Sequence, residues 1–298
     1  MSLFPFHNWY IDTQEAVPMP VNIVLSAVIL SMGAYGIMRI NMQIFPTAFQ
    51  EFALPLMILA IFSIVYFSLI AFAQNNIKRF VSYLNLALVG FIILGFSTVT
   101  YTGITGAILQ IIACSLVFTA IFLVTGVIYL RTKTFDINEF GGIARQMPKL
   151  MYFTIPVCFA AVGMPFLIMF SPLFMIITGM FTTELLDSLE FQLGGIFVIF
   201  AMILIAVCVL KFLHKIFYGN ILTQFKNIKD VSMSEFSSLL ILIIPIILFG
   251  FAPMLLINYY NNFVSVIMTT LTIDYLLCLT YWNAAVAAIA PSLAAVTN

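Results

Sequence analysis

Residues 71–96 read AFAQNNIKRFVSYLNLALVGFIILGF, and residues 104–130 read ITGAILQIIACSLVFTAIFLVTGVIYL. A helix needs roughly 20 predominantly apolar residues to cross a bilayer, and each run supplies them. Charged residues flank the runs at Lys78, Arg79, Arg131, Lys133 and Asp136. Otherwise only uncharged polar residues interrupt them, which is ordinary in packed membrane helices. The pattern therefore predicts two neighbouring membrane-spanning helices.

The composition of the whole chain extends this prediction. Of its 298 residues, 63% are hydrophobic and 7% are charged, whereas a soluble domain carries roughly 25% charged residues. A surface exposed to water cannot be built from so few charges, so the sequence predicts an all-α polytopic membrane protein. The formal net charge is zero, and without a basic patch no nucleic-acid partner is expected.

The chain divides into about seven or eight apolar segments of membrane-spanning length. The predicted helices cover residues 22–39, 51–73, 77–98, 103–130, 149–181, 193–218 and 236–259. Residues 1–19 are expected to form an interfacial segment before a helix bundle of residues 20–260. Residues 261–298 are expected to form either an eighth span or a helix that lies on the membrane surface.

The segment 149–181 is too long for one undistorted span and contains Pro156, Pro165 and Pro172. Proline inside a helix removes a backbone hydrogen bond and clashes with the preceding turn. We therefore expect a broken or kinked helix, which a membrane tolerates only where neighbours or water satisfy the freed backbone groups.

Charged residues are absent from the middle of the predicted spans. A proton or ion pump normally needs ionisable groups at membrane depth, yet the deepest bases are Lys211, His214 and Lys215 near the end of one span. Asp274 is the exception, in a segment whose placement is open. A protein with this distribution of charges is a poor candidate for a proton pump. The basic residues do not alternate cleanly between successive loops, so they do not assign a membrane orientation.

The four cysteines, Cys114, Cys158, Cys208 and Cys278, all lie in apolar runs, and no CxxC pair occurs. The sequence therefore predicts neither a disulfide framework nor a metal site. No nucleotide-binding fingerprint is present either, so no cofactor is expected in this chain.

Several motifs resemble one family in the same order. PFHNWYIDTQEAVP (5–18), LSAVILSMGAYGIMR (25–39), AFAQNNIKRFVSY (71–83) and YLRTKTFDINEFGGIARQMP (129–148) are similar to motifs of the antiporter-like subunits of respiratory complex I, and LHKIFYG and FGFAP extend the match. The combination resembles NADH-ubiquinone oxidoreductase chain 4 over roughly residues 4–260.

The resemblance implies a polar axis for protons in the family, and this chain departs from it. The positions of the family's lysine, two histidines and glutamate are occupied by Ser31, Leu88, Cys114 and Leu173. Candidate polar positions that match the family are His7, Asp12, Lys78 and Gln110, together with Arg79, Arg131 and Asp136. Most of these lie at helix ends, where anchoring of loops is a simpler role than proton transfer.

The resemblance also implies a fold of about fourteen helices in two inverted repeats, each with one broken helix. This chain corresponds to the C-terminal half, with one broken helix. We therefore expect a separate chain, from a split gene, to carry the missing N-terminal helices, because a half-fold would leave polar groups facing lipid.

The expected function is that of a membrane-arm subunit of the proton-translocating NADH:ubiquinone oxidoreductase. NADH, flavin, iron–sulfur clusters and ubiquinone would then be bound by other subunits. One hypothesis gives the chain a mainly structural role with a degenerate proton pathway. A second keeps an active route through water, Ser31, Gln110 and Cys114. A third makes it a subunit of a multi-subunit cation/proton antiporter.

The expected partners are the other membrane-arm subunits, the chain with the missing helices, and membrane lipids. The expected location is the mitochondrial inner membrane, with a bacterial cell membrane as the alternative.

Overall fold

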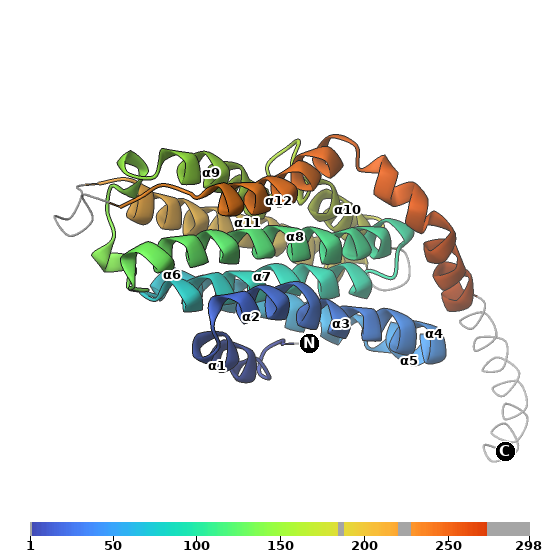
Figure 1. The fold of residues 1–298 in the computed structure, drawn as a ribbon. Coiled ribbons are helices and arrows are strands. Elements are labelled where there is room, and N and C mark those ends of the chain that lie inside the picture. The colour runs from blue at the N-terminus through green and yellow to red at the C-terminus, as the bar shows by residue number, and fades with distance from the viewer. Residues whose placement is uncertain (1, 184–187, 220–227, 273–298) are drawn as a thin grey trace, which may run out of the picture.

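Apolar helices run from one end of the bundle to the other in the computed structural model, which describes residues 2–183, 188–219 and 228–272 (Figure 1). Six described helices are long and apolar enough to cross a membrane: Met19–Ile44, Ala53–Ala73, Ile77–Ser97, Tyr101–Thr132, Leu189–Phe217 and Met233–Phe251. Two shorter apolar helices, Pro148–Val162 and Phe170–Phe181, make up the broken span. The prediction of an all-α membrane protein with about seven spans is confirmed.

The first span consists of five consecutive helical pieces. These are α2 (Met19–Val24), a π-helical turn Leu25–Ile29, α3 (Leu30–Gly36), a second π-helical turn Ile37–Asn41, and α4 (Met42–Ile44). A short α5 (Pro46–Glu51) then leads into α6 (Ala53–Ala73). In a π-helical turn the backbone hydrogen bonds span five residues in place of four, so the helix is locally widened.

The helix α7 (Ile77–Ser97) lies at the centre of the bundle, between α6 and α8 (Tyr101–Thr132). Its hydrophobic stretch is 94% buried, whereas that of α6 is 39% buried. The large apolar side chains of α11 (Ser188–Phe217), such as Phe197 and Phe200, are exposed by comparison. In a membrane those exposed side chains would face lipid or another subunit, while α7 contacts only protein.

Glycines allow α8 to approach α10 (Phe170–Phe181) closely. A Cβ added to Gly179 would lie 2.8 Å from the Cα atom of Gly103, and one added to Gly106 would lie 3.0 Å from the backbone nitrogen of Ile176. Small residues at such crossings let the two helix backbones approach closely. The resulting van der Waals contacts favour association of membrane helices.

One end of the bundle collects the positive charge. Backbone hydrogen bonds join Ile77 to Phe135 (2.9 Å) and Gly142 to Tyr218 (3.1 Å) across this end. It contains the starts of α7, α9 (Pro148–Val162) and α12 (Met233–Phe251), and the ends of α8 and α11. All described basic residues except Arg39 lie here, and we call it the basic end: Lys78, Arg79, Arg131, Lys133, Arg145, Lys149, Lys211, Lys215 and Lys229.

The predicted broken helix is interrupted between α9 and α10. Gly163 (φ +82°) ends α9, and Phe166 (φ +69°) adopts a left-handed conformation that is rare for a bulky residue. Pro165 lies in the interruption, whereas Pro156 lies inside α9 and Pro172 in the first turn of α10. The break therefore coincides with one of the three prolines.

The end of α12 packs directly on this break. The Phe166 and Phe251 rings stack with centroids 5.1 Å apart. Gly250 faces the backbone of Phe166 and Leu167, where a Cβ would come within 2.3 Å of the Phe166 carbonyl oxygen. The absence of a side chain at Gly250 is what permits this contact.

The predicted helix 236–259 is wrong at its C-terminal boundary. The helix α12 ends at Phe251, because Ala252 precedes Pro253 and leaves the helical region (φ −125°, ψ 64°). A further helix covers residues 254–272 and runs through the boundary expected at residue 260. Tyr101 bonds to Asn261 (2.8 Å) and Gln50 to the Leu271 carbonyl (2.9 Å), so this helix lies across the opposite end. Both alternatives for residues 261–298 stay predictions, because residues 273–298 lie outside the described part.

The segment before the first span contains α1 (Asn8–Ala16), which packs on α7. The Phe4 amide donates to the Ser63 hydroxyl (3.3 Å) near the middle of α6. The start of the expected interfacial segment therefore reaches well along α6, and only the later part lies near the basic end.

Replacing Gly250 by Ala should weaken the contact between α12 and the broken helix, because the new Cβ would collide with backbone that cannot move freely. We expect a loss of about 1–3 kcal/mol, typical of overpacking, and a lower thermal midpoint. The purified chain would be heated with a thiol-reactive dye that reports exposure of the buried Cys114, Cys158 and Cys208, in a Cys278→Ser background.

The matched control is Gly36→Ala, because a Cβ at Gly36 meets no atom within 4 Å. Its midpoint should stay constant or rise, since alanine is a better helix former than glycine by about 1 kcal/mol. Equal midpoints for wild type and Gly250→Ala would contradict the close backbone contact.

Candidate functional site

The position of the family lysine, Ser31, lies beside the first π-helical turn. Its hydroxyl donates to the carbonyls of Ala27 (3.0 Å) and Val28 (2.6 Å). The Ser115 hydroxyl of α8 reaches the same Ala27 carbonyl at 2.8 Å. Two serines therefore donate to one carbonyl of the π-helical turn, which stabilises the irregular backbone where no bulk water is present.

Gln110 and Cys114 form a second polar pair one turn apart on α8. The Gln110 amide nitrogen lies 3.5 Å from the Cys114 sulfur, and both side chains are buried. The amide oxygen of Gln110 has no hydrogen-bond partner among the described residues. A buried, unpaired acceptor of this kind costs about 1–3 kcal/mol unless a water molecule or another chain supplies a donor.

The other two family positions are apolar and tightly packed. Leu88 on α7 is 1% exposed and Leu173 on α10 is 2% exposed, and both belong to the hydrophobic core. A Cβ built on Gly163 would lie 2.6 Å from a methyl group of Leu173, so Leu173 fills the space beside the helix break. Neither side chain can hold or pass a proton.

The predicted position His7 lies in an aromatic surrounding. Its ring is 4.8 Å from the ring of Phe67 and 5.7 Å from that of Tyr66, and the side chain is 5% exposed. Burial lowers the pKa of His7 below its ordinary value, and a backbone hydrogen bond at Pro5 opposes this shift. This surrounding therefore favours the neutral form of the histidine. Asp12, one helical turn further along α1, is exposed.

A buried trio ties α1 to α7. The Tyr10 hydroxyl accepts from the side-chain amides of Gln14 (2.9 Å) and Asn85 (3.0 Å). All three side chains are fully buried, and burial raises the pKa of Tyr10. The trio fixes the register between the two helices. The sequence did not reveal it, because Asn85 lies 75 residues from Tyr10 in the chain.

The Lys78 side chain turns back toward the start of the first span. Its ammonium donates to the carbonyls of Val17 (2.8 Å) and Glu15 (3.2 Å) and lies 4.8 Å from the centre of the Phe135 ring. The neighbouring Arg79 instead pairs with the Glu15 carboxylate at 2.5 Å. Lys78 therefore anchors the connection between α1 and α2, which agrees with the anchoring role expected for residues at helix ends.

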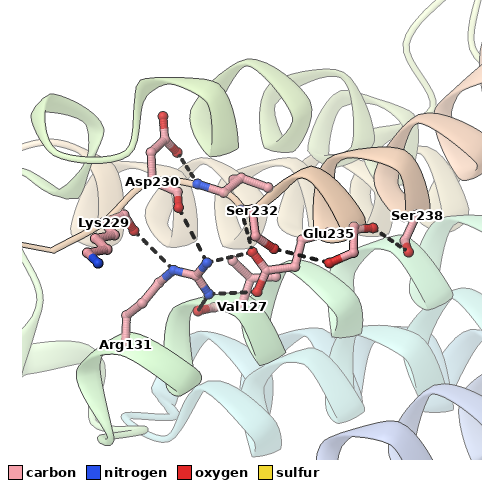
Figure 2. A network of polar contacts seen from close by, with 9 residues as sticks. Val127, Arg131, Lys229, Asp230, Ser232, Glu235 and Ser238 are labelled. Carbon is pink, nitrogen blue, oxygen red and sulfur yellow. Dashed lines mark hydrogen bonds and ion pairs between the residues drawn. The ribbon is translucent and has the colours of Figure 1, made fainter.

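The strongest polar network joins α8 to α12 (Figure 2). The Arg131 guanidinium contacts both carboxylate oxygens of Glu235, at 2.8 and 2.5 Å. It also donates to the carbonyls of Val127 and Lys229, both at 3.1 Å. A two-pronged contact of this geometry is the strong form of an arginine–carboxylate pair.

Glu235 has a second role in this network, because it closes a capping box with Ser232 at the start of α12. The Ser232 amide donates to the Glu235 carboxylate at 2.8 Å. Next to it, the Lys149 amide at the start of α9 donates to the Asp230 carboxylate at 3.1 Å. The Ser-x-x-Glu spacing before an apolar run was a readable capping signal; the pairing with Arg131 was not.

The described residues contain no group of three or more His, Cys, Asp or Glu side chains placed to hold a metal ion. The polar contacts found here support helix packing and local backbone geometry. Ser31 and Ser115 are brought together, as are Gln110 and Cys114, whereas Leu88 and Leu173 are buried in the apolar core.

A bundle of membrane-spanning helices with one broken helix and polar groups facing its interior is the class of fold used by ion-coupled membrane subunits. The chain matches, over residues 1–197, the model of the family described as NADH:quinone oxidoreductase/Mrp antiporter, TM. It belongs to that family, as the motifs predicted, and it is a multi-pass membrane protein.

The relatives carry the names of quinone oxidoreductase subunits. The chain is 32% identical to NADH-quinone oxidoreductase subunit M of Rickettsia prowazekii (strain Madrid E) over 260 residues, which cover 87% of this chain and 52% of that protein. It is 34% identical to the chloroplastic NAD(P)H-quinone oxidoreductase chain 4 of Cryptomeria japonica, covering 90% of this chain and 54% of the relative. The chain thus spans about half the length of the curated relatives it matches.

Solved structures share the fold. A chain of respiratory complex I from Thermus thermophilus with bound NADH superposes with a TM-score of 0.83 at 23% identity, covering 90% of this chain and 56% of that one. A chain of the Mrp complex from Dietzia sp. DQ12-45-1b gives 0.78 at 16% identity, covering 91% and 56%. At these identities the likeness concerns the fold.

Replacing Arg131 by Met should loosen α12 from α8, because the mostly buried carboxylate of Glu235 would lose its partner. Both side chains are less than one-fifth exposed (16% and 19%). We expect a destabilisation between the ~0–1 kcal/mol of exposed pairs and the ~3–5 kcal/mol of fully buried ones. The measurement is the thermal midpoint of the purified chain.

The matched control is Arg79→Met, which removes the exposed pair with Glu15 (44% and 39% exposed). Its midpoint should change much less. Equal losses for the two variants would show that the Arg131–Glu235 pair has no special role.

Proposed function

We propose that this chain is a component of the membrane arm of a proton-translocating NADH:ubiquinone oxidoreductase, and that its role there is mainly structural. Its family membership and the names of its relatives support the first part. The apolar packing of Leu88 and Leu173 supports the second. Transport of a proton requires a chain of groups that can bind and release it.

The observation that carries the structural role is the burial of Leu88 and Leu173 at positions where the family has ionisable groups. Both are packed into the apolar core, so replacing a histidine and a glutamate left no polar side chain there. The remaining polar groups, Ser31 and Ser115, donate to a helix carbonyl. The main role of these two serines is therefore to stabilise the helix backbone.

One observation favours a second candidate, an active route through water. The Gln110 amide oxygen is buried without a partner among the described residues, and a bound water could satisfy it. A cation/proton antiporter subunit is the third candidate; the Mrp-like fold is compatible with it. That activity would depend even more directly on the ionisable groups that Ser31, Leu88, Cys114 and Leu173 replace.

The proposal places NADH, flavin, iron–sulfur clusters and ubiquinone in other subunits. The partners would be neighbouring membrane-arm subunits and a separate chain that carries the N-terminal helices of the family fold. Exposed apolar residues of the first span, among them Met32 and Tyr35, offer a surface for that chain. We propose the mitochondrial inner membrane as the location, with a bacterial membrane as the alternative.

Mild-detergent purification followed by mass spectrometry tests these partners. We expect flavin-binding and iron–sulfur subunits to copurify, together with a short chain similar to the N-terminal half of the relatives. Recovery of sodium/proton antiporter subunits in their place would contradict the oxidoreductase assignment. Recovery of the oxidoreductase without a short chain would contradict only the split-subunit part.

Proton translocation tests the structural role. The variants Ser31→Ala, Gln110→Leu and Cys114→Ala should leave the number of protons moved per NADH oxidised unchanged in sealed vesicles. Arg131→Met should instead reduce the amount of assembled complex, because it weakens the packing of α8 and α12. A lower proton ratio in any of the first three variants, with normal assembly, would support the water route and overturn the structural role.

A further inference from the structure

A groove opens at the basic end between α2, α8 and α12. Its volume is about 660 Å³, within the size range of small-ligand sites and too small for a whole helix. Phe122, Gly126 and Leu130 of α8 form its floor, and Ile23 and Ser238 lie on the flanking helices. Gly126 gives the groove its depth, because an added Cβ would have only Met19 nearby, at 3.6 Å.

A buried cation stands at one edge of this mostly apolar groove. Lys78 lines it and is 6% exposed. An ammonium has three N–H donors, and two of those of Lys78 bond to the Glu15 and Val17 carbonyls. The ammonium also lies 4.8 Å from the centre of the Phe135 ring, and neither ion pair of the described residues includes Lys78. A buried charge without a counter-charge favours an anionic ligand.

The carboxylates near the groove are already neutralised. Glu235, which also lines it, is held by Arg131, and Glu15 is held by Arg79. A second cation, Lys133, lies 5.8 Å above the ring of Tyr129, another groove residue. The charge that faces the groove without a paired counter-charge is therefore positive.

The position of the groove along the membrane normal also favours an anionic ligand. The order of the bases along the chain assigns no orientation, but the structure gathers nearly all the described lysines and arginines at the basic end. Such an excess of bases is typical of the cytoplasmic or matrix side of a membrane. Anionic lipids act on that side, where basic pockets between membrane helices bind their headgroups.

We propose that the groove binds one anionic phospholipid, with its phosphate against Lys78 and an acyl chain along α8 between α2 and α12. The lipid supplies both the missing counter-charge and the apolar filling that the groove requires. This inference goes beyond the proposed function and does not depend on whether protons pass through the chain.

The test uses the full chain with its copurifying partners in phosphatidylcholine nanodiscs that contain phosphatidylglycerol with a photoreactive acyl chain. We expect crosslinks on residues 122–130 of α8, competed by unlabelled phosphatidylglycerol but not by phosphatidylcholine or inorganic phosphate. Lys78→Gln should reduce their yield about fivefold, the effect typical of one basic residue near a lipid surface. Gly126→Leu should reduce it by filling the groove.

The matched control is Lys149→Gln, which removes an exposed lysine at the same end but outside the groove. Its crosslink yield should match that of wild type. Equal competition by phosphatidylcholine, crosslinks unaffected by both Lys78→Gln and Gly126→Leu, or protection of α8 by a copurifying polypeptide would each overturn the proposal.

Discussion

The fold depends on one constraint: inside a hydrocarbon layer, a backbone carbonyl or amide must find its hydrogen-bond partner within the protein. Regular helices meet it by themselves, so irregular backbone occurs only where neighbours compensate. In the first π-helical turn of the first span, Ser31 and Ser115 both donate to the Ala27 carbonyl. The break between α9 and α10 is covered by the end of α12, which Gly250 allows to approach.

The same low-polarity environment explains where the charges lie. Ionisable groups are expensive in lipid, and the described ones gather at the helix ends, where Arg131 and Glu235 bind α8 to α12. The interior contains neutral polar groups, such as the Tyr10–Gln14–Asn85 trio. These groups contribute to helix register, while Leu88 and Leu173 are packed in the apolar core.

The positions that the resemblance assigns to ionisable groups have a simple structural role in this chain. The Ser31 hydroxyl is a local donor to the helix backbone. Leu88 and Leu173 are part of a packed core. Apolar residues in such a core need no hydrogen-bond partners, so they avoid the cost of buried polar groups.

The sequence by itself determined the membrane class, the number of spans and the family, because hydrophobic runs and local motifs depend on residues close together in the chain. It also indicated the broken helix from its prolines and the loss of ionisable groups at four positions. It could not give the exact end of α12 or the contact of Gly250 with Phe166. Only the tertiary structure decided which distant side chains meet: Arg131 with Glu235, Tyr10 with Asn85, and Lys78 with the groove beside α8. Such pairs depend on how the helices are arranged, and residue spacing along one helix carries no information about that arrangement.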